Sequence, residues 1–112
     1  VLDNVTADMR VYREEIFGPV ISLVPFTDRD AVMADANDTE TGLTAYVFTA
    51  DQALADQCAE RLAFGEIQIN GVKYGIDLPH GGIKQSGIGH DCSHLALHDY
   101  LAVKRISRAR SA

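Results

Sequence analysis

Several features that would point to a particular class of protein are missing from the sequence. No apolar run approaches the ~20 residues needed to cross a bilayer, so we expect no membrane-spanning helix. Only two cysteines occur, without regular spacing, which excludes a disulfide framework and favours a cytoplasmic location. Basic residues are scarce, since 10 Lys and Arg stand against 16 Asp and Glu for a net charge of -6. This balance argues against nucleic acid or a membrane surface as the main partner.

What is present suits a single globular unit. The chain has 112 residues, of which 46% are hydrophobic, and it contains no internal repeat or low-complexity stretch. It begins Val-Leu-Asp-Asn without an initiator Met. We therefore expect it to be a fragment of a longer polypeptide.

Apolar residues follow the spacing of alternating strands and helices. Thr27 and Asp51 are predicted helix caps, and Gly65 is predicted to stop the second helix. The run at residues 20–26 is apolar on both faces, as in a strand inside a covered sheet. The predicted order is strand 20–26, helix 27–37, strand 43–48, helix 51–64 and strand 66–70. This order predicts an α/β fold with a mainly parallel sheet and covering helices.

The sequence pattern of residues 70–106 is less regular. Residues 70–89 contain five glycines in the run from Gly71 to Gly87 and are predicted to form a functional loop, because so long a loop is unusual in a small domain. A short helix is expected at 93–100. The alternation at 101–106 predicts a terminal strand whose open edge would favour self-association.

The stretch Glu14-Glu15-Ile16-Phe17-Gly18-Pro19-Val20 stands where the first predicted strand begins. Two carboxylates and an aromatic ring precede a Gly-Pro break, and ligands often gather where strands of α/β sheets meet loops. From the residues alone, a solvated Glu pair in front of a strand is the favoured interpretation.

Four segments follow one another along the chain: the heptad 14–20, Ala36-Asn37-Asp38 with Gly42-Leu43, Gly65 to Asn70, and Leu78-Pro79-His80-Gly81-Gly82-Ile83-Lys84-Gln85-Ser86-Gly87-Ile88-Gly89. They resemble segments of the NAD(P)-dependent aldehyde dehydrogenase superfamily, and His80 in the last of them resembles its aminobutyraldehyde dehydrogenase-like branch. The resemblance covers nearly the whole chain, and four ordered motifs are specific where one would be weak. It implies that residues 1–100 are the C-terminal part of the catalytic domain and 101–112 an oligomerisation strand and tail.

The resemblance also implies the function and the partners. The parent would oxidise a small-molecule aldehyde to a carboxylic acid with NAD or NADP, and would form a homo-oligomer, a dimer or a tetramer. The family's nucleophilic cysteine, general-base glutamate and dinucleotide-binding domain would precede residue 1, so the chain alone is expected to be inactive. Neither Cys58 nor Cys92 lies in a segment resembling that of the nucleophile, so no catalytic residue is expected here.

Individual roles follow from the matching positions. Glu15 would accept hydrogen bonds from the nicotinamide ribose hydroxyls, since a carboxylate offers two acceptor oxygens to a vicinal diol. Phe17 would lie beside the nicotinamide, on the same side of an extended segment as Glu15. His80 replaces a Phe that lines the substrate tunnel in the family, and Asp77 nearby would help to attract an amine. Alternatively, His80 caps loop backbone groups and touches no substrate.

Other interpretations remain open for three features. Lys84 would serve the architecture of the loop or, alternatively, bind a phosphate. His90, His94 and His98 repeat every four residues, as in a helical metal site, but the HExxH glutamate is missing and no metal is expected. The chain as a whole could instead be a non-enzymatic α/β module that self-associates, or a histidine-based metal-binding protein.

Overall fold

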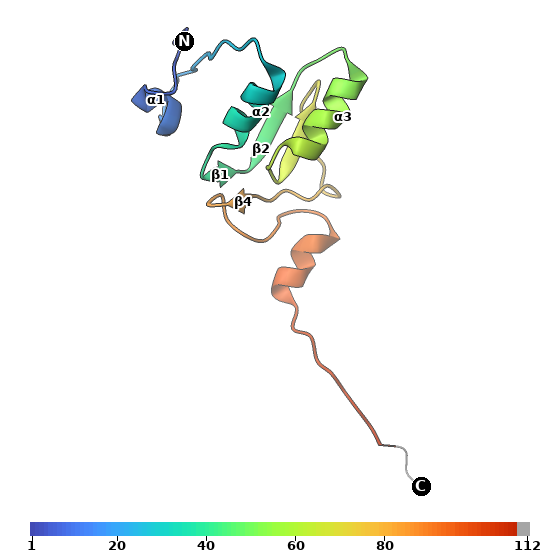
Figure 1. Cartoon of the computed structure of the whole chain (residues 1–112). Coiled ribbons are helices and arrows are strands. Elements are labelled where there is room, and N and C mark those ends of the chain that lie inside the picture. Colours follow the sequence, from blue (N-terminus) through green and yellow to red (C-terminus); the bar gives the residue numbers. More distant parts are fainter. Residues whose placement is uncertain (110–112) are drawn as a thin grey trace.

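The computed structural model describes residues 1–109 and builds them from short helices and strands joined by long connections (Figure 1). In chain order the elements are α1 (Arg10–Arg13), α2 (Arg29–Asn37), β1 (Thr41–Gly42), β2 (Thr44–Val47), α3 (Gln52–Arg61), β3 (Glu66–Ile69), β4 (Ile83–Lys84) and the 3-10 helix η1 (His94–Tyr100). None of the helices in this part of the chain is long and apolar enough to cross a bilayer. The radius of gyration is 19.7 Å, against about 13 Å for a compact domain of this length, so the molecule is elongated.

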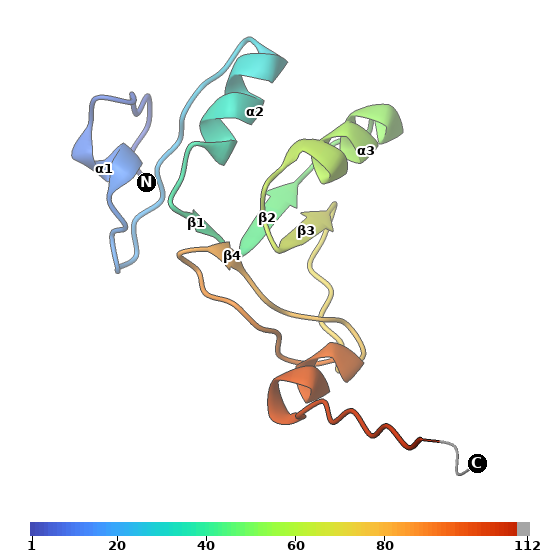
Figure 2. The ribbon, with the colours of Figure 1, turned by 60° about the horizontal axis from the view of Figure 1, so that its bottom comes forward.

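The centre of the molecule is the unit β2–α3–β3. The two strands run parallel, in a register that pairs Thr44 with Glu66 and Val47 with Ile69, so α3 is the crossover that the alternating pattern predicts. Helix α2 lies beside α3 over the same face of this sheet (Figure 1, Figure 2). The predicted α/β class, with parallel strands and covering helices, is confirmed. A second pair, β1 with β4, is antiparallel.

Both covering helices begin at an aspartate. The Asp28 carboxylate accepts hydrogen bonds from two backbone N–H groups in the first turn of α2, at 2.8 and 2.9 Å. Asp51 accepts one at 3.1 Å from the first turn of α3. The predicted cap Asp51 is therefore confirmed. The predicted cap Thr27 is wrong by one residue, because Asp28 is the cap of α2. A carboxylate is the better acceptor at the positive end of the helix dipole. Helix α3 ends at Arg61, before the predicted stop at Gly65.

The apolar core beneath the helices is small. Met33 of α2 and Ala55 and Cys58 of α3 are 8%, 1% and 8% exposed. Ala55 and Cys58 are three residues apart and therefore lie on one face of α3, which is its buried face. Cys58 is part of this core and, like Cys92, is a free thiol.

Asn37, the last residue of α2, joins α2 to the chain that leads into β3. Its Nδ2 donates a hydrogen bond to the Arg61 carbonyl at 2.8 Å, and its Oδ1 accepts one from the Ala63 N–H at 2.8 Å. A single side-chain amide therefore satisfies two backbone groups, one on the last residue of α3 and one just beyond it, at the end where a helix leaves carbonyl groups without partners. An ion pair between Arg61 and Asp30 (2.7 Å) lies nearby, but it is exposed and adds little.

The predicted covered strand at 20–26 is wrong for the described chain. Only Ser22 forms a bridge, parallel to Leu2, and Ile21 and Phe26 are 61% and 60% exposed. The physical reason is that an apolar run becomes a strand only beside partner strands, and here only the short segment 2–5 lies alongside it. The preceding helix α1 touches the rest of the fold through Arg13, whose guanidinium contacts the Asp38 carboxylate at 2.6 Å.

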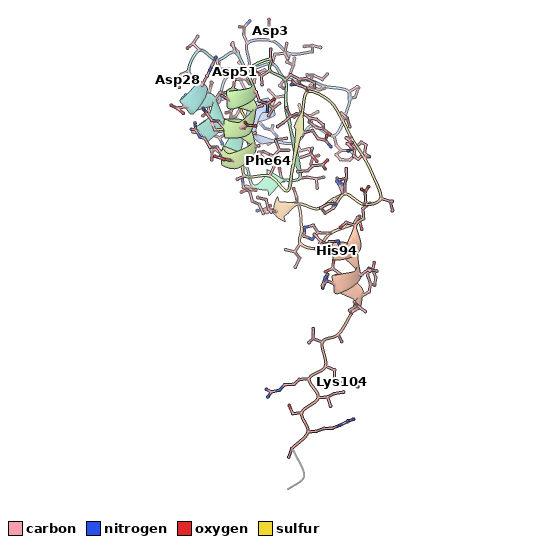
Figure 3. All side chains as sticks on the ribbon, turned by 90° about the vertical axis from the view of Figure 1, so that its right-hand side faces the viewer. Asp3, Asp28, Asp51, Phe64, His94 and Lys104 are labelled. Carbon is pink, nitrogen blue, oxygen red and sulfur yellow. The ribbon has the colours of Figure 1, made fainter. Side chains whose placement is uncertain are left out.

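The end of the described chain also differs from expectation. The predicted helix at 93–100 forms as the 3-10 helix η1, with the Ser93 hydroxyl accepting a hydrogen bond from the Leu95 N–H. The predicted strand at 101–106 is absent, since residues 101–109 lack regular secondary structure and are exposed. They run outward from η1, with Lys104 among their projecting side chains (Figure 3). A strand needs a ladder partner, and nothing in the described part of the chain pairs with this segment. The last three residues of the predicted tail lie outside the described residues.

Candidate functional site

The segment 70–89, predicted as a loop without regular structure, is held to the sheet at several points. The side-chain amide of Gln68, in β3, donates a hydrogen bond to the Lys73 carbonyl and accepts one from the Lys73 N–H, both at 3.0 Å. Further on, His80 and Asp91 form an antiparallel bridge with backbone hydrogen bonds of 2.8 and 2.7 Å. Strand β4 then pairs with β1. The loop is therefore anchored to the strands both before and after His80.

Lys84 anchors the far side of this loop. Its Nζ donates hydrogen bonds to the carbonyl oxygens of Asn37 (2.9 Å) and Thr39 (3.1 Å) and lies 5.6 Å from the centre of the Phe64 ring. An ammonium group is well placed there, because the C-terminal end of a helix such as α2 carries partial negative charge. These contacts favour the architectural interpretation of Lys84 over phosphate binding.

The imidazole of His80 contacts the carboxylate of Glu66. The distance from His80 Nδ1 to Glu66 Oε2 is 3.0 Å, and the two side chains are 39% and 17% exposed. Glu66 is the first residue of β3, and its side chain points to the same face as that of Gln68 because strand residues alternate. In the described part of the chain, the His80 ring thus contacts the Glu66 side chain and does not cap loop backbone groups, as the alternative prediction had it. Only the backbone of His80 pairs with the loop, at Asp91.

The surroundings of Glu66 favour its ionised form. The hydrogen bond from His80 is the main reason that the pKa of Glu66 lies below its usual value, partial burial opposes the shift, and hydrogen bonds from Gln68 and Thr44 reinforce it. The carboxylate therefore carries its charge near neutral pH and acts purely as an acceptor.

Two hollows meet at the His80–Asp91 bridge. The larger, of about 480 Å³, is lined by residues 73–76 of the loop and by Glu66, His80 and Cys92, among others. The smaller, of about 240 Å³, lies on the other side, between residues 86–91 and the end of η1. His80 and Asp91 line both. The larger hollow falls in the size range of small-molecule sites.

The predicted cofactor residues lie elsewhere on the molecule. Glu15 is exposed, Phe17 is 97% exposed, and within residues 1–109 neither makes a side-chain hydrogen bond or ion pair. Glu14 instead pairs with Arg10 at 2.7 Å, which lowers the pKa of Glu14. The turn after α1 and the loop 70–80 lie on opposite sides of the β1–β4 pair (Figure 2), so the structure does not bring Glu15 and Phe17 together with His80.

The histidine repeat near the end of the chain is divided between two structures. His90 lies in the loop, whereas His94 and His98 belong to η1. Side chains of a 3-10 helix eclipse at every third residue, so a spacing of four no longer gives one face. Among residues 1–109 no group of three or more His, Cys, Asp or Glu side chains is arranged to hold a metal ion.

Glu66 is the site residue that the sequence did not single out. The sequence pattern predicts it only as the first residue of the strand at 66–70. The available signal was a charged residue on the same strand face as Gln68, next to a loop rich in glycine. This signal indicates a site only once the path of the loop is known, because the loop brings His80, 14 residues later, next to Glu66.

The matching family model places this molecule among known proteins. The model, described as the aldehyde dehydrogenase family, matches residues 1–106. The chain belongs to the aldehyde dehydrogenase family. Betaine aldehyde dehydrogenase from Rhizobium leguminosarum is 45% identical over 107 residues, which make up 95% of this chain and 22% of that protein. The succinate semialdehyde dehydrogenase Sad from Escherichia coli is 40% identical over 111 residues, 98% of this chain and 24% of that protein.

Solved structures of aldehyde dehydrogenases agree with this fold. The NAD+ complex of the Bacillus cereus enzyme has a TM-score of 0.85 and 40% identity, covering 91% of this chain and 21% of that one. Apo betaine aldehyde dehydrogenase from Staphylococcus aureus, a G234S mutant, has a TM-score of 0.86 and 37% identity over 91% and 21%. The family resemblance seen in the sequence is confirmed, and this aldehyde dehydrogenase chain spans about a fifth of the length of these relatives.

Proposed function

We propose that this chain forms part of the catalytic domain of an NAD(P)-dependent aldehyde dehydrogenase that oxidises a small aldehyde to a carboxylic acid. The observation that carries the proposal is the family match over residues 1–106. Because the chain spans about a fifth of the length of such relatives, we propose that it has no turnover by itself. Purified 112-residue chain that oxidised an aldehyde would refute this second point.

Glu15 and Phe17 are proposed to hold the nicotinamide end of the cofactor, which accepts a hydride when bound. Their chemistry fits this role, because an ionised carboxylate accepts hydrogen bonds from a ribose diol and a ring packs against a pyridine. Their surroundings support it as well. The Phe17 ring is 97% exposed, and the Glu15 carboxylate makes no hydrogen bond or ion pair to any described residue, whereas Glu14 is engaged by Arg10.

The experiment uses the complete enzyme, that is, this chain joined to the amino-terminal part that its relatives have. That part comes from the Rhizobium leguminosarum relative, of which this chain covers 22%. Glu15→Gln should lower kcat/KM for NAD+ by about tenfold, since a hydrogen bond to a charged group is lost. Glu14→Gln is the matched control, one residue away, and should change it less than twofold. Equal effects of the two changes would contradict the ribose role.

His80 is proposed to line the substrate site. The hollow of about 480 Å³ beside it supports this proposal. The substrate is proposed to be a small aldehyde, because the hollow has the size of small-molecule sites. The test is the steady-state kinetics of His80→Phe with a set of small aldehydes. If His80 lines the substrate site, the change should alter kcat/KM by different factors for different aldehydes.

Residues 101–106 are proposed to pair with a second subunit in a homo-oligomer. They alternate like a strand, and Leu101, Val103 and Ile106 are 69%, 101% and 73% exposed, which leaves both the backbone edge and the apolar side chains available. Ending the complete enzyme after Tyr100 should lower its molar mass in light scattering, and Val103→Asp should do the same. An unchanged mass in both variants would remove the proposal.

We also propose a cytoplasmic location. Cys58 and Cys92 are both free thiols, a state that the reducing cytoplasm maintains. Fractionation of cells that produce the complete enzyme would test this, and enzyme found mainly outside the cytoplasm would contradict it.

A further inference from the structure

Two basic side chains from distant parts of the chain meet at the carboxyl end of α2. Lys84, in β4, donates hydrogen bonds to the carbonyl oxygens of Asn37 at 2.9 Å and Thr39 at 3.1 Å. Arg13, the last residue of α1, donates from Nη1 to the carbonyl oxygen of Asp38 at 3.2 Å and to its carboxylate at 2.6 Å. Two cations therefore hold three successive backbone carbonyls, those of residues 37–39, which we call the α2 junction.

The end of a helix is a suitable place for such a junction. The last carbonyl groups of a helix have no partner within it and carry partial negative charge, so Lys and Arg side chains bind them. The α2 junction is also fixed to the core of the fold, because the side chain of Asn37 bonds to the chain at the end of α3. A shift of either cation is therefore resisted by the rest of the fold.

On one side, the α2 junction is tied to the proposed cofactor segment. Arg13 stands two residues before Glu15. Within residues 1–109, the backbone hydrogen bonds of residues 14–20 run only within this stretch or to α1. Arg13 is therefore the anchor nearest to Glu15 along the chain.

On the other side, the α2 junction is tied to the loop that carries His80. Lys84 follows His80 by four residues, and its φ is +57°, a left-handed conformation that is unfavourable for residues other than glycine. The contacts of its ammonium group with the α2 junction, and with the ring of Phe64 at 5.6 Å, stabilise this conformation. Lys84 thus holds the end of the loop on the junction.

We infer that Arg13 and Lys84 are positioning residues that couple the proposed cofactor segment to the proposed substrate loop through the α2 junction. The two segments lie on opposite sides of the β1–β4 pair (Figure 2), but both are attached to the same three residues. This inference rests on the proposed roles of Glu15 and His80 and goes beyond them in naming the residues that relate the two. Loss of either cation should therefore affect the binding of both NAD+ and the aldehyde.

A double-mutant cycle in the complete enzyme tests the coupling. Arg13→Met and Lys84→Met each keep an unbranched side chain and remove the charge, and the double variant combines them. Arg13→Lys is the conservative variant, because both contacts come from one nitrogen that an ammonium group can replace. The matched control is Arg29→Met, since Arg29 is an exposed arginine at the other end of α2. The Kd for NAD+ is measured by calorimetric titration without aldehyde, and the KM for a small aldehyde at saturating NAD+.

Arg13→Met should raise the Kd for NAD+ by about two- to fivefold, the range expected for an exposed ion pair. Lys84→Met lies on the substrate side and should still raise this Kd by about two- to threefold, and Arg13→Met should raise the KM for the aldehyde by a similar factor. The double variant should bind NAD+ no more weakly than the weaker single variant, since either change breaks the same connection. Arg13→Lys and Arg29→Met should bind NAD+ like the unmodified enzyme.

A merely structural role would give a different pattern. Arg13→Met and Lys84→Met would then lower the melting temperature and leave the Kd for NAD+ of the folded enzyme unchanged, which would overturn the inference. An effect of Lys84→Met on this Kd that is equally large with Arg13 and with Met at position 13 would also overturn it, because the two cations would then act independently.

The variant Glu15→Gln separates failure of the coupling from failure of the proposed function. If Glu15→Gln leaves the Kd for NAD+ unchanged, the proposed cofactor role of Glu15 fails and the inference fails with it. If Glu15→Gln raises this Kd but Arg13→Met and Lys84→Met do not, only the coupling through the α2 junction is refuted.

Discussion

The close approach of two backbone segments at Gly65 can be tested by adding a single methyl group. A Cβ atom at Gly65 would lie 1.9 Å from the carbonyl oxygen of Gly81. Ordinary van der Waals contact begins near 3.4 Å, so Gly65→Ala would push this carbonyl away by about 1.5 Å. The obstacle is backbone rather than the end of a flexible side chain. The strain must therefore be relieved by movement of the loop.

This movement would reach the candidate site directly. Gly81 follows His80, so a shift of about 1.5 Å would open the 3.0 Å contact between His80 and Glu66. Overpacking of this kind costs about 1–3 kcal/mol, and we expect Gly65→Ala to lower the free energy of unfolding of the complete enzyme by this amount. If His80 lines the substrate site, kcat/KM for a small aldehyde should also fall by about tenfold.

The matched control is Gly71→Ala in the same loop, because a Cβ atom at Gly71 has no heavy atom within 4 Å. Thermal unfolding at one fixed scan rate and steady-state kinetics would be measured for both variants. If Gly65→Ala kept the melting temperature and the kinetics of Gly71→Ala, the tight packing of the loop against the start of β3 would be wrong.

Two further predictions concern the contacts that hold the sheet and the loop. Asn37→Ala removes the hydrogen bonds to the Arg61 carbonyl and the Ala63 N–H and should lower the free energy of unfolding by about 1–3 kcal/mol. Hydrogen exchange of the Ala63 amide should become faster, and unchanged protection would contradict the role of Asn37. Since the folded state lowers the pKa of Glu66, its stabilising effect is present above the ordinary value of 4.5 and is lost as the pH falls through the folded pKa. The difference in unfolding midpoint between the unmodified enzyme and Glu66→Gln should therefore be largest near pH 7 and shrink below about pH 4.5, whereas a constant difference would refute the linkage.

The elements that could be predicted from the sequence are those fixed by local signals. The spacing of apolar residues in α3 and the aspartate cap at Asp51 act within one or two helical turns, and both were correct. The parallel pair β2 and β3 followed because a strand, helix and strand in succession have a strongly preferred crossover. By contrast, β4 is two residues long and has no periodic pattern that could have announced it.

What the sequence missed depends on partners distant in the chain. The apolar runs at 20–26 and 101–106 have strand composition, but composition does not supply a neighbouring strand, and both are largely exposed. The contact between His80 and Glu66 similarly requires the course of the loop between them. The family resemblance predicts a site role for His80, and only the structure relates its ring to a carboxylate on the sheet.

The exposed apolar segment at 20–26 affects how this polypeptide would behave when a ribosome releases it on its own. Chaperones bind, and proteases cut, strand edges that lack a partner and carry exposed apolar side chains. Such edges also pair between copies of a chain and cause aggregation. Ile21 and Phe26 present such a surface, whereas the paired strands β2 and β3 do not share it. Synthesis within one longer polypeptide, or alongside a complementary one, would bury this surface before it could recruit quality control.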